Sequence, residues 1–284
     1  MKLTVAQALA EARERAVDRL DAQLLLAAVL RRSRAWLLAH DDAPLGEEPS
    51  RAFRGALARR AAGEPLAYIL GEKEFHGLML KVDDRVLVPR PDTETLVDWA
   101  LELLGGDLAS VASPCVIDLG TGSGAIALAI KRACPRAQVS ASDASDAALA
   151  LARANGETLG LEVDWRAGSW WQAVPGQRFQ LAVSNPPYIA EGDPHLDALV
   201  HEPPMALTSG PHGLEAIREI VSQAPGRLHP GGWLLLEHGH DQAPAVRALL
   251  AQAGFVDLQS RADLAGIERC SGGRRASSVT PGAE

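Results

Sequence analysis

The chain has 284 residues, of which 47% are hydrophobic and 23% charged, and its formal net charge is −8. This length predicts about two domains of ~150 residues, and the composition excludes a disordered chain, a collagen-like repeat and a disulfide-stapled miniature scaffold. No apolar run approaches the ~18 residues of a membrane span, and the N-terminal segment lacks a leader pattern. We therefore expect no membrane partner and a cytoplasmic location. The acidic balance also argues against stable binding of nucleic acid, which requires a basic surface.

Cysteine and histidine do not form a recognisable metal site in the sequence. Cys115, Cys134 and Cys270 have no CxxC spacing, and the eight histidines include no HExxH motif. We therefore expect neither a metal ion nor a disulfide framework.

The first part of the chain predicts a small helical domain over residues 1–65. Apolar residues recur three and four positions apart in four segments: 5–17, 20–32, 33–40 and 49–63. Residues 66–91 alternate apolar and polar residues around glycines, which predicts a β-hairpin linker.

Residues 92–271 predict an α/β catalytic domain with a Rossmann-like, doubly wound and mostly parallel sheet. After a helix at 92–104, short apolar runs predict strands at 115–120, 137–143, 161–167, 179–187, 232–239 and 254–260. Helices are expected between them at 125–134, 146–160, 214–228 and 242–253. Alternation of this kind is typical of a sheet with helices on both faces. Residues 272–284 are small and polar, which predicts a flexible tail.

A glycine-rich turn follows the first strand of this sheet. Gly120, Gly122 and Gly124 stand at alternate positions of IDLGTGSGA, residues 117–125, so the backbone can turn sharply and approach a ligand closely. Asp143 ends the next strand, where a carboxylate can accept hydrogen bonds from both hydroxyls of a ribose. The pattern indicates a cofactor that contains a nucleoside.

Two kinds of cofactor fit this turn. Gly120, Gly122 and Ala125 satisfy the permissive dinucleotide pattern, which would make the protein an NAD-dependent oxidoreductase. Asp118 favours S-adenosylmethionine, which has a cationic amino-acid end and no pyrophosphate, and so does the early third glycine. The turn alone leaves both open.

The segment Asn185-Pro186-Pro187-Tyr188 directly follows another strand and therefore faces the same edge of the sheet. The Asn185 side-chain oxygen and the Pro186 carbonyl can accept both N–H bonds of a planar amino group and direct its lone pair at a methyl donor. Tyr188 offers an aromatic face on which a planar amide or base can stack. We therefore expect Asn185, Pro186 and Tyr188 to be catalytic. An oxidoreductase would not need an arrangement that holds an amino group in this way.

With these motifs in place, the chain resembles the release factor glutamine methyltransferases, a family of class I S-adenosylmethionine-dependent methyltransferases. The resemblance extends over RLDAQLLL (19–26), GEPLAYILGEKEFHGLMLKV (63–82), VLVPRPDTETLV (86–97), DLGTGSGAIALA (118–129), VSNPPYI (183–189), EPPMAL (202–207), GLEAIREI (213–220), LHPGGWLLLEHG (228–239) and DLAGIERC (263–270). It implies a helical substrate-docking domain and a seven-stranded catalytic domain.

The resemblance also implies a reaction and a set of site residues. The reaction is N5-methylation of the glutamine in the Gly-Gly-Gln motif of class I peptide chain release factors, and it converts S-adenosylmethionine to S-adenosylhomocysteine without a metal. The implied cofactor-binding residues are Gly120, Thr121, Gly122, Ser123, Gly124, Asp143, Trp170 and Asn185. The implied substrate-binding residues are Asn185, Pro186, Pro187 and Tyr188.

Some assignments stay open in the sequence. Trp171 adjoins Trp170, and either indole could stack on the adenine. Arg90 is expected to fix the junction between the domains, and Glu202 and Glu237 to shape a substrate channel or hold loops.

Two alternative functions also remain. N6-adenine DNA methyltransferases share the Asn-Pro-Pro-Tyr motif but need a basic module that reads DNA, and the chain has no cluster of basic residues. The other alternative is a non-catalytic module that binds S-adenosylmethionine.

Overall fold

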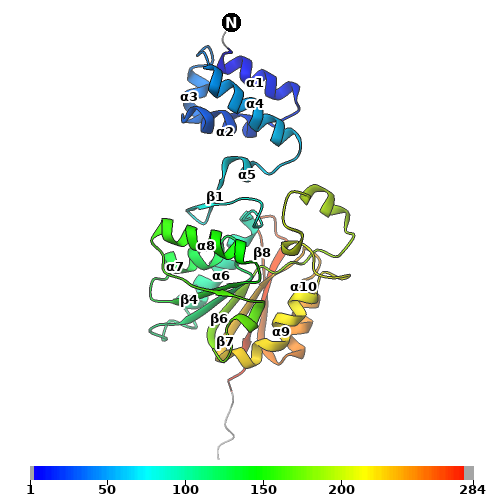
Figure 1. Ribbon diagram of the computed structural model, residues 1–284. Helices are drawn as coiled ribbons and strands as arrows, with labels where there is room; N and C mark the ends of the chain where they lie inside the picture. Colours follow the sequence, from blue (N-terminus) through cyan, green and yellow to red (C-terminus); the bar gives the residue numbers. More distant parts are fainter. Residues whose placement is uncertain (1–2, 278–284) are drawn as a thin grey trace, which may run out of the picture. The chain divides into compact units, whose positions relative to one another are not determined.

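The computed structural model describes residues 3–277, which form two compact units (Figure 1). Unit 1 comprises the chain up to Lys73 together with Val82–Asp84, and unit 2 comprises Glu74–Lys81 and the chain from Arg85 onward. The strands β1 (Glu72–Phe75) and β2 (Leu78–Lys81) pair as the expected hairpin. Most of this hairpin belongs to unit 2 and is not a separate linker, because its buried side chains pack into the core of that unit.

Unit 1 is helical and has a core of its own. Its helices are α1 (Val5–Glu14), α2 (Arg19–Leu30), α3 (Arg34–Ala39), α4 (Glu47–Ala61) and α5 (Leu66–Leu70). Thr4, Asp18 and Ser33 cap the first three helices through their side-chain oxygens, which satisfies free amides at each N-terminus. Residues 66–70 were expected to be extended, but they form α5, which ends at Gly71 with a left-handed φ of +77°.

Unit 2 contains a seven-stranded sheet in the order β5-β4-β3-β6-β7-β9-β8. The strands are β3 (Cys115–Leu119), β4 (Gln138–Asp143), β5 (Asp164–Ala167), β6 (Phe179–Ser184), β7 (Leu228–Glu237), β8 (Phe255–Ala262) and β9 (Glu268–Arg275). β9 runs antiparallel to both of its neighbours, β7 and β8, whereas the pairs formed among β3, β4, β5, β6 and β7 are parallel. The chain passes from β3 to β4 on one side and returns to β6 on the other, and such a switch point opens a crevice at the carboxyl ends of the strands.

Helices cover both faces of this sheet, which confirms the expected doubly wound fold (Figure 1). One face packs against α6 (Glu94–Gly105), α7 (Ala125–Ala133) and α8 (Asp146–Leu159), and the other against α9 (Glu215–Arg227) and α10 (Ala243–Gln252). Short 3-10 helices lie in the connections: η1 (Pro91–Thr93), η2 (Trp170–Ala173), η3 (Pro194–Leu199) and η4 (Pro204–Ala206).

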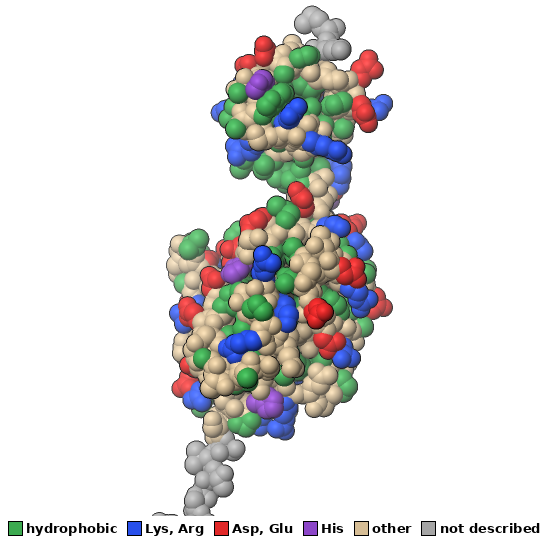
Figure 2. Space-filling model, turned by 90° about the vertical axis from the view of Figure 1, so that its left-hand side faces the viewer, with side chains coloured by type: hydrophobic (Ala, Val, Ile, Leu, Met, Phe, Trp, Pro, Cys, Tyr) green, Lys and Arg blue, Asp and Glu red, His purple; other side chains and the backbone are tan. Residues whose placement is uncertain are grey.

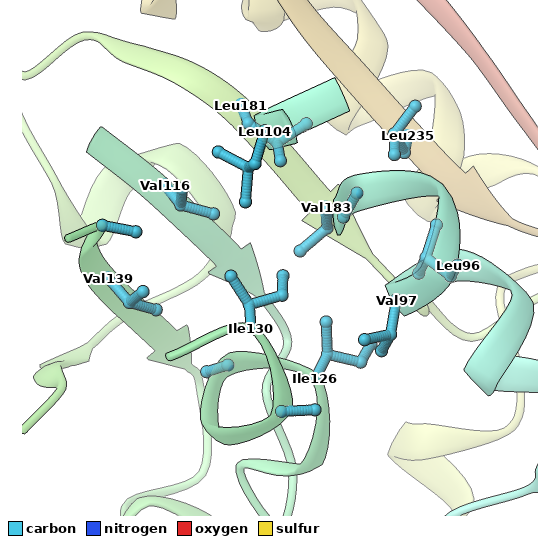
Figure 3. Packing of buried hydrophobic residues seen from close by; sticks show 14 of the residues in the cluster. Leu96, Val97, Leu104, Val116, Ile126, Ile130, Val139, Leu181, Val183 and Leu235 are labelled. Carbon is cyan, nitrogen blue, oxygen red and sulfur yellow. The ribbon is translucent and has the colours of Figure 1, made fainter. Parts of the chain in front are cut away.

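The two cores follow from the two-residue period of the strands. Val116 of β3 packs with Val183 of β6 and Ile126 of α7 on one face, as Figure 3 shows. The next residue, Ile117, contributes to the core on the opposite face, under α9 and α10. A strand buried on both sides therefore appears in the sequence as a continuous apolar run.

The prediction of a flexible tail from residue 272 is wrong for residues 272–275, which belong to β9. Small residues occur there because the strand is crowded. A Cβ on Gly272 would lie 2.5 Å from Leu235 Cδ2, and one on Gly273 would lie 2.7 Å from Leu258 Cδ2. Glycine in a strand often marks such a close approach. Of the rest of the predicted tail, residues 276–277 are exposed and have no regular secondary structure, and residues 278–284 lie outside the described residues.

Across residues 3–277, no helix combines the length and the apolar character needed to cross a membrane.

Candidate active site

A cavity of about 260 Å³ opens at the carboxyl ends of β3, β4 and β6. It brings together most of the predicted site residues, namely Gly120, Thr121, Gly122, Ser123, Asp143, Trp170, Asn185 and Pro187. Gly124, Pro186 and Tyr188 are absent from its wall. All of the lining residues belong to unit 2.

The glycine turn needs its glycines for both conformation and space. Gly120, Gly122 and Gly124 have φ angles of +75°, +55° and +84°, in the left-handed region that favours glycine. A Cβ on Gly120 would lie 2.9 Å from the Trp170 ring, and one on Gly124 would lie 3.0 Å from the Trp165 ring. A Cβ on Gly122 would meet nothing within 4 Å, so this glycine borders open space.

Four amides of this turn are engaged within the protein. Their acceptors are Ser142 O for Gly120 and Thr121 (2.8 and 2.9 Å), Asp143 Oδ2 for Gly122 (2.9 Å) and Thr121 O for Gly124 (2.9 Å). A dinucleotide site leaves such amides free to bind the pyrophosphate. The turn therefore suits a nucleoside cofactor without phosphate better than it suits NAD.

Asp143 is held in the cavity wall by backbone amides. Its two oxygens accept hydrogen bonds from Gly122 N (2.9 Å) and Ser145 N (2.8 Å), which fixes the plane of the carboxylate. Burial raises the pKa of Asp143, and these amides oppose the rise. Each oxygen keeps a second lone pair for a hydroxyl donor.

Asp118 lies outside the cavity, although its position in the motif suggested that it favours a cofactor with a cationic end. It is fully buried and does not line the cavity, and its Oδ2 accepts from the Thr121 hydroxyl (2.6 Å) and from Ala127 N (3.3 Å). Burial raises the pKa of Asp118 to about 7. Its position therefore indicates that Asp118 joins the turn to α7, and it does not support direct contact with a cationic ligand.

The structure distinguishes the two adjacent tryptophans. Trp170 lines the cavity and has an unusual positive φ of 47°, whereas Trp171 is fully buried and donates from Nε1 to Ile220 O at 2.9 Å. Trp170 is therefore the indole that can meet a ligand, and Trp171 is a core residue.

The Asn-Pro-Pro-Tyr segment follows β6, and its asparagine has a fixed orientation. Asn185 Nδ2 donates to Thr93 Oγ1 at 3.2 Å, so the side-chain oxygen remains available as an acceptor. Pro186 is buried. Tyr188 is half-buried, and its hydroxyl donates to Glu237 Oε1 over 3.4 Å. Burial, together with the Glu237 charge, raises the pKa of Tyr188 above its usual value.

Arg90 corrects another expectation. It was expected at the junction between the domains, but it lines the cavity and forms an ion pair with Glu202 of the same unit. Glu202 is 4% exposed, and its second oxygen accepts from Val88 N at 3.0 Å. Glu202 thus fixes the segment before η1, which also forms part of the cavity wall.

Two residues that sequence reasoning did not assign to the site also shape it. Thr93 orients Asn185, and Asn155 of α8 donates to Ser123 O at 2.9 Å while bonding both backbone groups of Lys81. Asn155 thereby connects the glycine turn to β2. A polar residue within a helix was the only sequence signal for it.

Comparisons with known proteins agree with this geometry. Residues 3–71 match the PrmC N-terminal domain family and residues 93–199 the methyltransferase small domain family. The chain is 54% identical to the release factor glutamine methyltransferase of Bordetella pertussis, over 90% of this chain and 95% of that protein. It is 50% identical to the enzyme of the same name from Burkholderia pseudomallei, over 91% and 92% of the two chains.

The chain belongs to the release factor glutamine methyltransferase family. Among solved structures, the T. thermophilus 16S rRNA N2 G1207 methyltransferase, determined with AdoMet and guanosine, has a TM-score of 0.53. It is 21% identical and aligns with 72% of this chain and 49% of its own, a likeness of fold. The family and the fold agree with the use of S-adenosylmethionine.

Within residues 3–277, no group of three or more His, Cys, Asp or Glu side chains is arranged to hold a metal ion.

Proposed function

We propose that this protein transfers a methyl group from S-adenosylmethionine to the side-chain amide nitrogen of the glutamine in the Gly-Gly-Gln motif of class I release factors. The observation that carries the proposal is the position of Asn185. Its oriented amide stands in the wall of the cavity that also contains the glycine turn and Asp143. The release factor substrate is supported by the family to which the chain belongs.

The cavity residues fit such a cofactor. The Asp143 carboxylate has lone pairs for two ribose hydroxyls, the Trp170 ring offers a surface for adenine, and Gly122 leaves space where any other side chain would stand. When bound, S-adenosylmethionine supplies an electrophilic methyl group on a positively charged sulfur.

The chain's own residues position the amide. Asn185 Oδ1 and the Pro186 carbonyl accept the two N–H bonds of the glutamine side chain, which holds the nitrogen and aims its lone pair into the cavity. These acceptors also stabilise the positive charge that grows on nitrogen during attack. Because the proton leaves after methylation, no strong base has to act first. Positioning is therefore the main source of rate.

An adenine in DNA is the competing substrate, because its amino group could occupy the same acceptors. The face of unit 2 in Figure 2 carries Lys and Arg side chains interspersed with Asp and Glu, which does not form a continuous basic surface. Together with the net charge of −8, this favours a protein substrate.

The test is mass spectrometry of a purified class I release factor after incubation with the protein and S-adenosylmethionine. We expect one added methyl group, located on the glutamine of Gly-Gly-Gln. A factor in which that glutamine is replaced should remain unmodified. An adenine-containing DNA duplex, incubated in parallel at physiological salt, should gain no methyl group. Methylation of the DNA alone would overturn the proposal.

A further inference from the structure

Gln242, directly before α10, connects three segments of unit 2 through its side chain. The side-chain nitrogen donates to the carbonyl oxygens of Tyr188 at 3.0 Å and Gly213 at 3.3 Å. The side-chain oxygen accepts from the backbone amide of Gly239 at 2.9 Å. These three partners follow β6, precede α9 and follow β7, respectively. Tyr188 is the last residue of the Asn-Pro-Pro-Tyr segment, so one side chain joins the end of that segment to two others.

We propose that Gln242 and Gly213 are positioning residues that hold the Tyr188 end of the Asn-Pro-Pro-Tyr segment in place for methyl transfer. This inference rests on the proposed function and deepens it. Neither residue lines the cavity, so both act on the reaction through the segment and not through the cofactor.

The partners of Gln242 fix the orientation of its side-chain amide. A carbonyl oxygen can only accept a hydrogen bond, and a backbone N–H can only donate one. The NH2 group must therefore face Tyr188 and Gly213, and the oxygen must face Gly239. Because none of these groups titrates, the arrangement is independent of the charge on any neighbour.

The segment depends on anchors at its ends because its two central residues are prolines. A proline has no backbone N–H, so neither of them can donate a hydrogen bond to a neighbouring strand or loop. The prolines also stiffen the backbone, so a shift at Tyr188 is passed on to the acceptors of Asn185 and Pro186. Thr93 holds the Asn185 side chain at one end. Gln242 holds the backbone at the other end.

Gly213 gives an independent observation at the same contact. Its φ is +70°, and a Cβ there would lie 2.3 Å from Tyr188 O and 3.0 Å from Gln242 Nε2. The Tyr188 oxygen belongs to the backbone, so rotating a side chain could not relieve the clash. The absence of a side chain at Gly213 is therefore what lets the Tyr188 carbonyl reach the amide of Gln242.

The first test is Gln242→Met, which keeps the length of the side chain and removes its amide. Gln180→Met is the matched control, because Gln180 Oε1 accepts from Cys115 N at 2.7 Å near the start of β6, away from the cavity. We expect Gln242→Met to lower kcat for release factor methylation about tenfold or more, because displaced acceptors misalign the glutamine. Its Kd for S-adenosylhomocysteine should stay within about twofold of wild type, and Gln180→Met should keep kcat within about threefold.

The second test, Gly213→Ala, disturbs the same contact without changing Gln242. Gly176→Ala is its control, since Gly176 has a similar φ of +74° but a Cβ there would meet nothing within 4 Å. Both variants carry the strain of an alanine in the left-handed region, and only Gly213→Ala pushes against Tyr188 O. We expect Gly213→Ala to lower kcat about tenfold or more and Gly176→Ala to keep it within about threefold.

The outcomes separate this inference from the proposed function. Failure of the wild-type protein to methylate the factor would remove the proposed function. In a protein that does methylate it, a wild-type kcat for Gln242→Met or for Gly213→Ala would overturn this inference alone. An equal loss of kcat in either control would show a general weakening of the fold and would also overturn it. So would a loss of S-adenosylhomocysteine affinity that accompanies the loss of kcat.

Discussion

Asn185 has its two polar atoms in different surroundings, since the nitrogen is bound to Thr93 and the residue lines the cavity. Asn185→Ala removes an acceptor that matters chiefly in the reacting complex, so we expect kcat to fall by about 100-fold or more. The affinity for S-adenosylhomocysteine, measured by calorimetry, should change little. Wild-type turnover in this variant would contradict the role assigned to its amide.

Asp143 is the residue at which cofactor affinity should respond. Asp143→Asn keeps the shape but places an NH2 group against the backbone amide of Gly122 or Ser145. The side chain then loses one of the hydrogen bonds that hold it and one acceptor for a ribose hydroxyl. We expect the Kd for S-adenosylhomocysteine to rise about tenfold or more. The exposed Asp107→Asn is the control and should bind as wild type does. Equal affinities for the two variants would exclude Asp143 from the ribose role.

Glu237 connects the site to the pH dependence of stability. Burial raises its pKa from 4.5 to about 7, so between those pH values the folded chain holds a proton that the unfolded chain has lost. The carboxyl group therefore makes the free energy of unfolding fall as pH rises from about 4.5 to 7, and it adds no further slope above 7.

Glu237→Gln removes this titration. We measure the free energy of unfolding in urea at pH 5 and pH 8. The difference between variant and wild type, variant minus wild type, should be larger at pH 8 than at pH 5. The exposed Glu157→Gln should show no such change. A parallel pH dependence in Glu237→Gln and wild type would show that the buried carboxyl does not titrate in this range.

At the scale of the elements, β9 depends on the absence of side chains. A Cβ on Gly272 would lie 2.5 Å from Leu235 Cδ2 and 2.7 Å from Leu234 O, so the strand or its neighbours would have to shift. We expect Gly272→Ala to lower the free energy of unfolding by about 1–3 kcal/mol, as overpacking generally does. Thermal unfolding followed by circular dichroism would measure this loss.

Gly226→Ala in α9 is the matched control for this substitution. Nothing lies within 4 Å of its added Cβ, and alanine favours a helix over glycine by about 0.5–1 kcal/mol. This variant should be as stable as wild type or slightly more stable. If Gly272→Ala behaved in the same way, the crowding assigned to β9 would be wrong.

The sequence predicted the helices and strands whose apolar residues recur with a regular spacing. It did not predict the elements whose conformation depends only on packing against distant residues. The buried strands β3 and β6 and the second half of β7 contain apolar runs, β4 alternates polar and apolar residues, and the helices between them show their amphipathic spacing. The strand β9 contains Ser271, Gly272 and Gly273, which lack a pattern and are explained only by the neighbours they touch. The helix α5 is five residues long, too short to show a period.

The same contrast applies to the site. Local motifs predicted the glycine turn, Asp143 and Asn185, because their chemistry is contained in a few consecutive residues. The interaction of Thr93 with Asn185 spans 92 positions, and that of Tyr188 with Glu237 spans 49, so no local pattern contains either of them. The choice between Trp170 and Trp171 likewise required the structure, in which Trp170 lines the cavity and Trp171 is buried in the core.

At the scale of the whole molecule, the two units have separate cores, and every residue that lines the cavity belongs to unit 2. A ligand present at 100 times its Kd stabilises the part that binds it by about 2.7 kcal/mol. With S-adenosylhomocysteine at that concentration, we expect hydrogen exchange of the slowest amides of β3 and β6 to slow about 100-fold. The amides of α2 in unit 1 should keep their rates. Equal protection of α2 would show that the two units open together.

The place of β9 has a consequence for the order in which the protein folds. During synthesis β8 emerges before β9, yet it can join the sheet only through β9, and until then the edge of β7 is unpaired. An unpaired edge can capture other strands, so this interval exposes the nascent chain to aggregation. Glu237 lies on that edge opposite Cys270, so its buried carboxyl group, which accepts from the Tyr188 hydroxyl, is enclosed only when this pairing forms. Activity should therefore appear late in folding, after most of the sheet has assembled.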